Sequence, residues 1–156
     1  MLETFRRAPT TPQTGLDVDD PALLQLRKAC RLVGAAEFLD AENGYYTVVI
    51  EAALSAIERT SQFYLLDTAL LHDDDYVTTE QVYDRGEQAG LYDHDVRDKL
   101  LDLWRNNRSR TYYREGIGSQ QRATDMATLA RETHDHVLHV AGYSHECICR
   151  EQRDSG

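Results

Sequence analysis

The segment from Trp104 to Arg114 reads Trp-Arg-Asn-Asn-Arg-Ser-Arg-Thr-Tyr-Tyr-Arg and holds four arginines and two tyrosines. Guanidinium groups bind phosphate through paired hydrogen bonds and stack on flat bases, while tyrosine rings stack and their hydroxyls form hydrogen bonds. This composition favours a nucleotide or RNA ligand over a sugar or a lipid. We expect Arg105 and Arg108 to bind phosphate, and Tyr112 and Tyr113 to stack on a base or form hydrogen bonds with it.

The arginine segment lies in an acidic protein. Asp and Glu number 27 against 17 Lys and Arg, which gives a formal net charge of -10, and the lysines are Lys28 and Lys99. Such an excess weakens non-specific attraction to polyphosphates and keeps a surface hydrated in concentrated salt. A halophilic surface and an ordinary acidic surface from an arginine-preferring genome explain it equally well. Both interpretations exclude broad DNA binding, so a nucleic acid must be bound locally, through the arginines.

Length and composition predict one soluble domain, because 156 residues with 41% hydrophobic content suit a single core. No apolar run approaches the roughly 20 residues that cross a bilayer, and residues 1–15 lack a signal-peptide core, so we expect a cytoplasmic protein. The three cysteines are Cys30, Cys147 and Cys149. An odd number without an export signal favours free thiols, and the helical apolar pattern around Cys30 places it in the core.

The apolar pattern predicts an all-α fold, a five-helix up-and-down bundle with flexible ends. We expect a disordered arm over residues 1–18, the bundle over residues 19–141 and a flexible tail over residues 142–156. Asp19-Asp20-Pro21 is a helix start signal, with an acidic cap followed by proline in the first turn. The expected helices cover about 21–40, about 45–71, a short one from the Thr78–Gln81 capping box to about 89, one from Asp93 or Asp95 into the arginine segment, and one from Ser119 to Gly142.

The second expected helix is apolar almost all round, apart from one polar stripe. Glu51, Ser55, Glu58 and Gln62 are spaced four, three and four residues apart, which places them on one helix face. A half-buried arginine needs a carboxylate partner, so Glu51 and Glu58 could bind the arginines of the segment while the tyrosines fill the end of the bundle. This structural role competes with ligand binding, and both can hold together.

The order of these elements resembles the HEPN domain family. The likeness rests on a long helical hairpin, joined through Glu42-Asn43-Gly44-Tyr45-Tyr46 and continuing from Val48 to Leu66, then a short helix and a helix with an Arg motif. It covers about Asp19 to Ala141. The resemblance implies a homodimer with the Arg/Tyr patches at its two-fold cleft. It also implies frequent partnership with a small nucleotidyltransferase in toxin-antitoxin-like or defence operons.

The Arg motif decides which members the chain resembles. In the nuclease members an Arg and a polar residue precede a catalytic His, and Arg105-Asn106 begins that arrangement with no His in reach. Other small members carry Arg, four residues and Tyr, as Arg108 to Tyr113 does. A tyrosine with a pKa near 10 needs a large downward shift to act as a base at neutral pH, whereas a histidine does not.

We therefore expect a binding protein without catalytic residues, and the alternative is a metal-independent HEPN-type ribonuclease that uses Arg105 or Arg108. The ligand-binding candidates, with two supporting carboxylates, are Arg105, Asn106, Arg108, Tyr112, Tyr113, Glu51 and Glu58.

A second set of candidate residues lies near the end of the chain. It comprises His134, His136, His139, His145, Cys147 and Cys149. Zinc takes these ligand types, and His136 and His139 are three residues apart on a helix, a workable chelating pair. No Cys-x-x-Cys spacing accompanies them, so we expect surface or core histidines, free thiols and no metal or cofactor. A metal-assisted hydrolase is the weaker alternative.

Overall fold

A computed structural model describes residues 1–107, 119–143 and 148, and within these ranges the chain forms helices and no strand. The helices are α1 (Leu2–Arg7), α2 (Pro21–Glu42), α3 (Tyr46–Asp67), α4 (Thr79–Gln88), α5 (His94–Asn107) and α7 (Gln120–Ala141). The all-α class is confirmed for the described residues. The five expected helices correspond to α2, α3, α4, α5 and α7, while α1 is an additional helix in the arm that we expected to be disordered.

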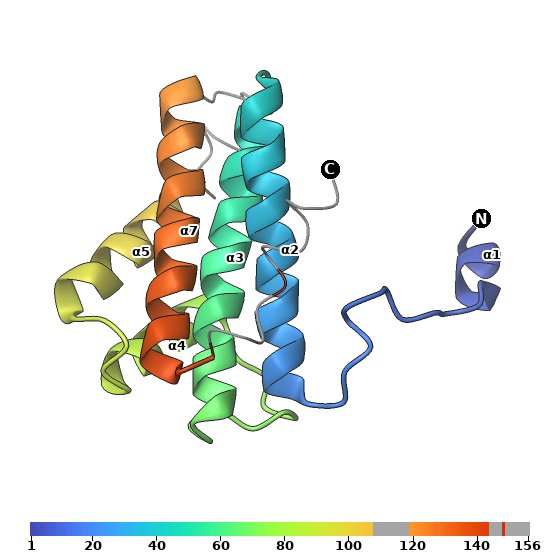
Figure 1. Cartoon of the computed structure of the whole chain (residues 1–156), viewed down its shortest axis with the longest axis horizontal. Helices are drawn as coiled ribbons and strands as arrows, with labels where there is room; N and C mark the ends of the chain where they lie inside the picture. Colours follow the sequence, from blue (N-terminus) through green and yellow to red (C-terminus); the bar gives the residue numbers. More distant parts are fainter. Residues whose placement is uncertain (108–118, 144–147, 149–156) are drawn as a thin grey trace.

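Three long helices, α2, α3 and α7, lie side by side and enclose the core (Figure 1). α3 returns antiparallel to α2. α7 runs parallel to α3. Gln120 at the start of α7 binds Asn43, just before α3 begins, and Tyr143, just beyond the end of α7, binds Asp67 at the end of α3. Each large apolar side chain buried here contributes about 1.5–3 kcal/mol. The largest fully buried ones include Leu26, Val33, Val49, Ile57, Phe63 and Val137.

Local capping signals set the helix starts where the sequence predicts them. The Asp20 carboxylate accepts a hydrogen bond from the Ala22 N–H at 2.9 Å. Thr78 and Gln81 form the predicted capping box: the Thr78 hydroxyl accepts from the Gln81 N–H, and the Gln81 side chain accepts from the Thr78 N–H. At the start of α7, the Ser119 hydroxyl accepts a hydrogen bond from the Arg122 N–H at 3.2 Å.

α3 ends at Asp67, four residues before the expected end, because the chain turns into a left-handed conformation at Ala69 (φ 58°). The Ala69 N–H bonds to the Leu66 carbonyl at 3.1 Å and the Leu70 N–H to the Leu65 carbonyl at 2.8 Å. This pair of bonds closes the helix end in a Schellman motif. The apolar pattern alone continues through Leu70 and Leu71, so it could not reveal the stop.

α4 and α5 form a second layer against α3. Val82 and Tyr83 of α4 and Leu100 and Leu101 of α5 are buried, and the rest of each helix is largely polar. Ile148, which falls within the expected flexible tail, is also buried, in a cluster with Leu26 and Phe63. Among the described residues, no helix has the length and apolar character that a membrane span requires.

The helix end at Ala69 gives a test of the fold. Replacing Ala69 with Gly should raise the free energy of unfolding by about 1 kcal/mol, because a left-handed conformation penalises any Cβ. The control Ala35→Gly, at an exposed position within α2, should lower it by about 1 kcal/mol. Urea unfolding measures both changes, and a loss of stability in Ala69→Gly would contradict the assignment of this helix end.

Candidate functional site

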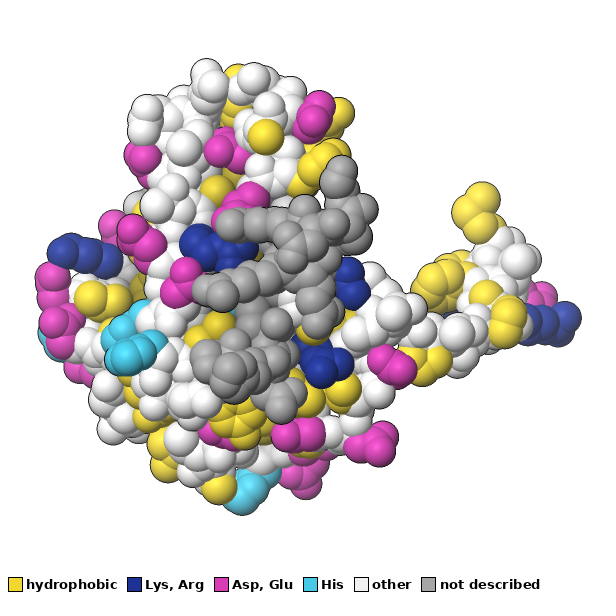
Figure 2. All heavy atoms as spheres, in the orientation of Figure 1, with side chains coloured by type: hydrophobic (Ala, Val, Ile, Leu, Met, Phe, Trp, Pro, Cys, Tyr) yellow, Lys and Arg dark blue, Asp and Glu magenta, His cyan; other side chains and the backbone are white. Residues whose placement is uncertain are grey.

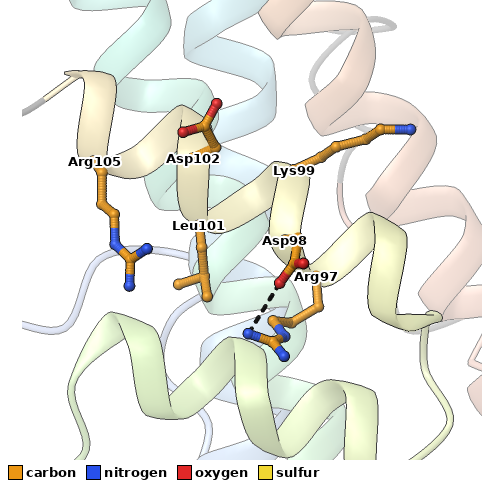
Figure 3. A pocket seen from close by; sticks show the side chains of 6 residues that line it. All are labelled: Arg97, Asp98, Lys99, Leu101, Asp102 and Arg105. Carbon is orange, nitrogen blue, oxygen red and sulfur yellow. Dashed lines mark ion pairs between the residues drawn. The ribbon is translucent and has the colours of Figure 1, made fainter.

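The described part of the candidate site is the side of α5 that faces α4. Arg97, Leu101 and Arg105 follow one another at intervals of four residues and point toward α4 in Figure 3. Leu101 is buried, while the two arginines meet carboxylates on α4. The α4–α5 contact therefore combines a small apolar centre with an arginine on either side of it.

Arg97 is fully engaged in structural ion pairs. Its Nε donates to Glu87 at 2.9 Å, and its Nη1 lies 3.5 Å from Asp84 and 3.0 Å from Asp98. The hydrogen bond from Arg97, with a second from His94, lowers the pKa of Glu87 below its ordinary value. The same contact with Glu87 raises the pKa of Arg97. Surrounded in this way, Arg97 fixes the start of α5 on α4.

Arg105 differs from Arg97 in exposure and in the number of its carboxylate partners. Its Nε and Nη2 both donate to one oxygen of Glu80, at 3.2 and 3.1 Å, and its side chain is 59% exposed. Glu80 lies in the first turn of α4, two residues after the capping Thr78. An exposed pair of this kind contributes about 0–1 kcal/mol, so Arg105 can exchange its carboxylate for another anion at little cost.

A surface hollow of about 430 Å³ connects the two arginines. Arg97, Asp98, Lys99, Leu101, Asp102 and Arg105 line it. Lys99 points away from α4 and pairs with Asp95 at 2.6 Å (Figure 3). The hollow thus has mixed charge, and Arg105 lies at the end that leads into the arginine segment.

The structure places only part of the predicted site. Arg105 and Asn106 are described, and the Asn106 side chain donates weakly to Asp102 at 3.4 Å. Arg108, Tyr112 and Tyr113 lie outside the described residues. The space-filling view in Figure 2 shows one face of the molecule and leaves these residues in grey.

The carboxylate that binds Arg105 is Glu80, whereas the sequence singled out Glu51 and Glu58 as supporting residues. Glu51 is exposed on α3. Glu58 accepts hydrogen bonds from the Thr79 hydroxyl at 3.1 Å and the Gln62 amide at 3.3 Å. The capping box at Thr78 indicated that Glu80 opens a helix, but its contact with Arg105 depends on how α4 packs against α5.

A second polar group lies inside the three-helix core. His134 of α7 lies between Cys30 of α2 and Thr60 of α3, and all three are fully buried. Its Nε2 is 3.4 Å from the Cys30 Sγ and its Nδ1 is 3.4 Å from the Thr60 Oγ1. Because the Thr60 hydroxyl donates to the Ala56 carbonyl at 2.7 Å, it must accept from Nδ1–H. Nε2 of the neutral ring then accepts from the thiol.

These residues have the types of a thiol nucleophile and its base, and all three side chains are fully buried. Their contacts join α2, α3 and α7 within the core. The expected core position of Cys30 is confirmed. His134, which the sequence grouped with the possible zinc ligands, is a core residue.

The remaining candidate zinc ligands are His136, His139, His145, Cys147 and Cys149. The Nε2–H of His136 donates to the Leu91 carbonyl at 3.0 Å, and His139 is exposed. His145, Cys147 and Cys149 lie outside the described residues. Within the described ranges, no three His, Cys, Asp or Glu side chains are arranged to hold a metal ion.

Two tyrosines of the second layer, Tyr83 and Tyr92, have surroundings that do not suit a general base. The hydroxyls of Tyr83 and Tyr92 are buried without a well-formed hydrogen bond. Burial raises the pKa of Tyr83, and it raises the pKa of Tyr92 to about 12. Gly86 makes room for Tyr92, since a Cβ there would lie 2.3 Å from the phenol oxygen. Both pKa values have moved away from the range that a base needs near neutral pH.

A protein-family model described as a domain of unknown function, DUF8154, matches residues 2–149. The chain belongs to the DUF8154 family. The match extends from α1 through the bundle to the segment around Ile148, so α1 is part of the family's domain. Neither a curated protein nor a solved structure matches the chain.

The ion pairs of Arg97 predict a pH dependence of stability. The pKa of Glu87 is lowered on folding, so its contribution is complete above the ordinary glutamate pKa and is lost as pH falls through the folded value. Between about pH 6 and about pH 3, the wild-type protein should lose more stability than Glu87→Gln. Urea unfolding at both pH values measures this, with Glu51→Gln on the exposed face of α3 as control. Equal losses in the wild type and Glu87→Gln would contradict the prediction.

The buried histidine predicts a large effect of truncation. His134→Ala removes a packed ring and leaves Thr60 and Cys30 without it, so the free energy of unfolding should fall by about 2–4 kcal/mol. His139→Ala, exposed on the same helix, should change it by less than about 0.5 kcal/mol. If thermal unfolding followed by circular dichroism shows equal effects for the two variants, the core assignment of His134 is wrong.

Proposed function

We propose that this protein is a non-catalytic, cytoplasmic binding protein that takes the phosphates of an RNA or a nucleotide at the Arg105 end of α5. The observation that carries the proposal is the state of Arg105: it is 59% exposed and oriented by one surface carboxylate, Glu80. The chain continues from there into Arg108, Arg110 and Arg114. A folded helix therefore presents one exposed guanidinium next to the most arginine-rich stretch of the sequence.

The energetics favour exchange of Glu80 for phosphate. An exposed carboxylate pair contributes about 0–1 kcal/mol, whereas a charge-assisted bidentate bond to phosphate is among the stronger polar contacts. Before a ligand binds, the Glu80 carboxylate already orients the Arg105 guanidinium. Binding therefore costs less side-chain entropy. Arg97 cannot take this role, because three carboxylates surround it.

The charge of the whole chain restricts the contact to this region. A net charge of -10 repels a polyanion from most of the surface. We therefore propose a short contact, with Arg108 adding phosphate contacts and Tyr112 and Tyr113 stacking on bases. Following the HEPN resemblance, we also propose a homodimer and a nucleotidyltransferase as a protein partner.

Fluorescence anisotropy with a labelled single-stranded RNA, competed by ATP, tests the proposal. Arg105→Ala should weaken binding about tenfold and reduce its salt dependence by about one phosphate contact. Arg108→Ala should have a similar effect. Lys28→Ala is the control, because it removes the same charge from α2, and Lys28 does not line the hollow.

Three outcomes contradict the proposal. If the wild type does not bind RNA or ATP saturably, or if Lys28→Ala weakens binding as much as Arg105→Ala, the Arg105 end of α5 is not the site. If the wild type cleaves the RNA and the Arg105 and Arg108 variants do not, the ribonuclease alternative replaces the non-catalytic one.

A further inference from the structure

Helix α1 is an amphipathic element that its own chain leaves uncovered. Every residue from 1 to 14 is exposed, and Leu2 and Phe5 remain 77% and 82% exposed. The two lie three residues apart, on one side of the helix. Figure 2 shows the segment standing clear of the bundle, with hydrophobic and basic side chains at its far end.

The base of this arm is fixed while its end projects. The Thr14 carbonyl accepts a hydrogen bond from Arg31 at 2.6 Å, and the Gly15 carbonyl accepts one from Arg27 at 3.0 Å. Both arginines belong to α2, so residues 14 and 15 are attached to the bundle and only the residues before them extend outward (Figure 1). An apolar helix face presented at the end of an anchored arm is suited to docking on another surface.

A surface of matching character lies where α3 meets α4. A hollow of about 180 Å³ is lined by Leu70, Arg85, Gln88 and Ala89, and Leu70 is 52% exposed beside it. Next to it is the turn His72-Asp73-Asp74-Asp75, closed by hydrogen bonds between His72 and Asp75. Asp75 also lies 3.9 Å from Arg85, which places the acidic turn at the edge of the hollow. Asp73 and Asp74 are exposed.

The charges of the two surfaces are complementary. α1 carries Arg6 and Arg7 against one acid, Glu3, which pairs with Arg7, so its side chains keep an excess of one positive charge. The turn offers two exposed carboxylates, Asp73 and Asp74. The acidic chain as a whole would repel α1 and its attached bundle from an anionic membrane. A second copy of this chain offers Leu70 and Ala89 at the hollow and the opposite charge at the turn, while Arg85, which also lines the hollow, pairs with Asp75.

We infer that α1 of one copy docks its Leu2 and Phe5 face into the α3–α4 hollow of a second copy, with Arg6 and Arg7 against the partner's Asp73 and Asp74. Each copy of a two-fold dimer gives one arm and receives one, so the contact forms twice. This contact specifies how the proposed homodimer is held. Dimerisation is measured without RNA, so a failure of this inference can be distinguished from a failure of RNA binding.

Sedimentation velocity over about 1–100 μM protein tests the exchange, because this range detects dissociation constants in the micromolar region. Phe5→Ser should raise the dimer dissociation constant by about tenfold or more. The charge reversals Arg6→Glu with Arg7→Glu, and Asp73→Arg with Asp74→Arg, should each weaken the dimer similarly. Glu42→Arg with Glu132→Arg, two exposed acids elsewhere on the bundle, is the control and should leave it unchanged.

Mixing the two charge-reversed variants gives the sharpest readout. Each variant alone places like charges together, whereas a mixed dimer has opposite charges at both contacts, so mixing should restore the wild-type dissociation constant. The inference is overturned if the wild type stays monomeric throughout this range, as it would with α1 docked on its own bundle. It is also overturned if Phe5→Ser leaves the dimer unchanged or if mixing restores nothing.

Discussion

The orientation of α5 on α4 depends on Arg97. Apolar packing of Leu100, Leu101, Leu103 and Trp104 holds α5 against the core, whereas the Arg97 guanidinium pairs with Asp84 and Glu87 of α4. Three carboxylates from α4 and α5 surround the Arg97 guanidinium and set the distance between the two helices. Two turns further along the same face, Arg105 occupies an equivalent position with a single, exposed partner. One arginine therefore secures the scaffold, and this leaves the other available for a ligand.

Local chemistry in the sequence predicted most helix boundaries. Asp20 with Pro21, the Thr78–Gln81 box, Ser119 and Gly142 act within a few residues of themselves, so their effect can be read without the fold. The end of α3 could not be predicted in this way. Ala69 adopts a left-handed conformation that alanine disfavours, and Leu71 just beyond it is buried against Leu65 and Val82, which come from α3 and α4.

The sequence predicted which types of residue form the candidate site, but it did not predict which residues pair with one another. The arginine segment identified Arg105, but its carboxylate partner is 25 residues away and belongs to a helix whose position depends on tertiary packing. The same limit applied to His134. Its neighbours Cys30 and Thr60 are 104 and 74 residues distant in the sequence, so composition alone grouped it with the nearby histidines. Polar residues gain their roles from distant partners, and periodicity does not identify these partners.

We propose that phosphate replaces Glu80 at Arg105 while Arg97 keeps its carboxylate partners. NMR of the arginine side-chain Nε–H groups during titration with a short RNA tests it most directly, with Arg105→Lys and Arg97→Lys used to assign the signals. The Arg105 resonance should shift progressively to saturation, while the Arg97 resonance should stay in place. A shift at Arg97 of equal size, or an Arg105 signal that does not move while the RNA binds, would contradict it.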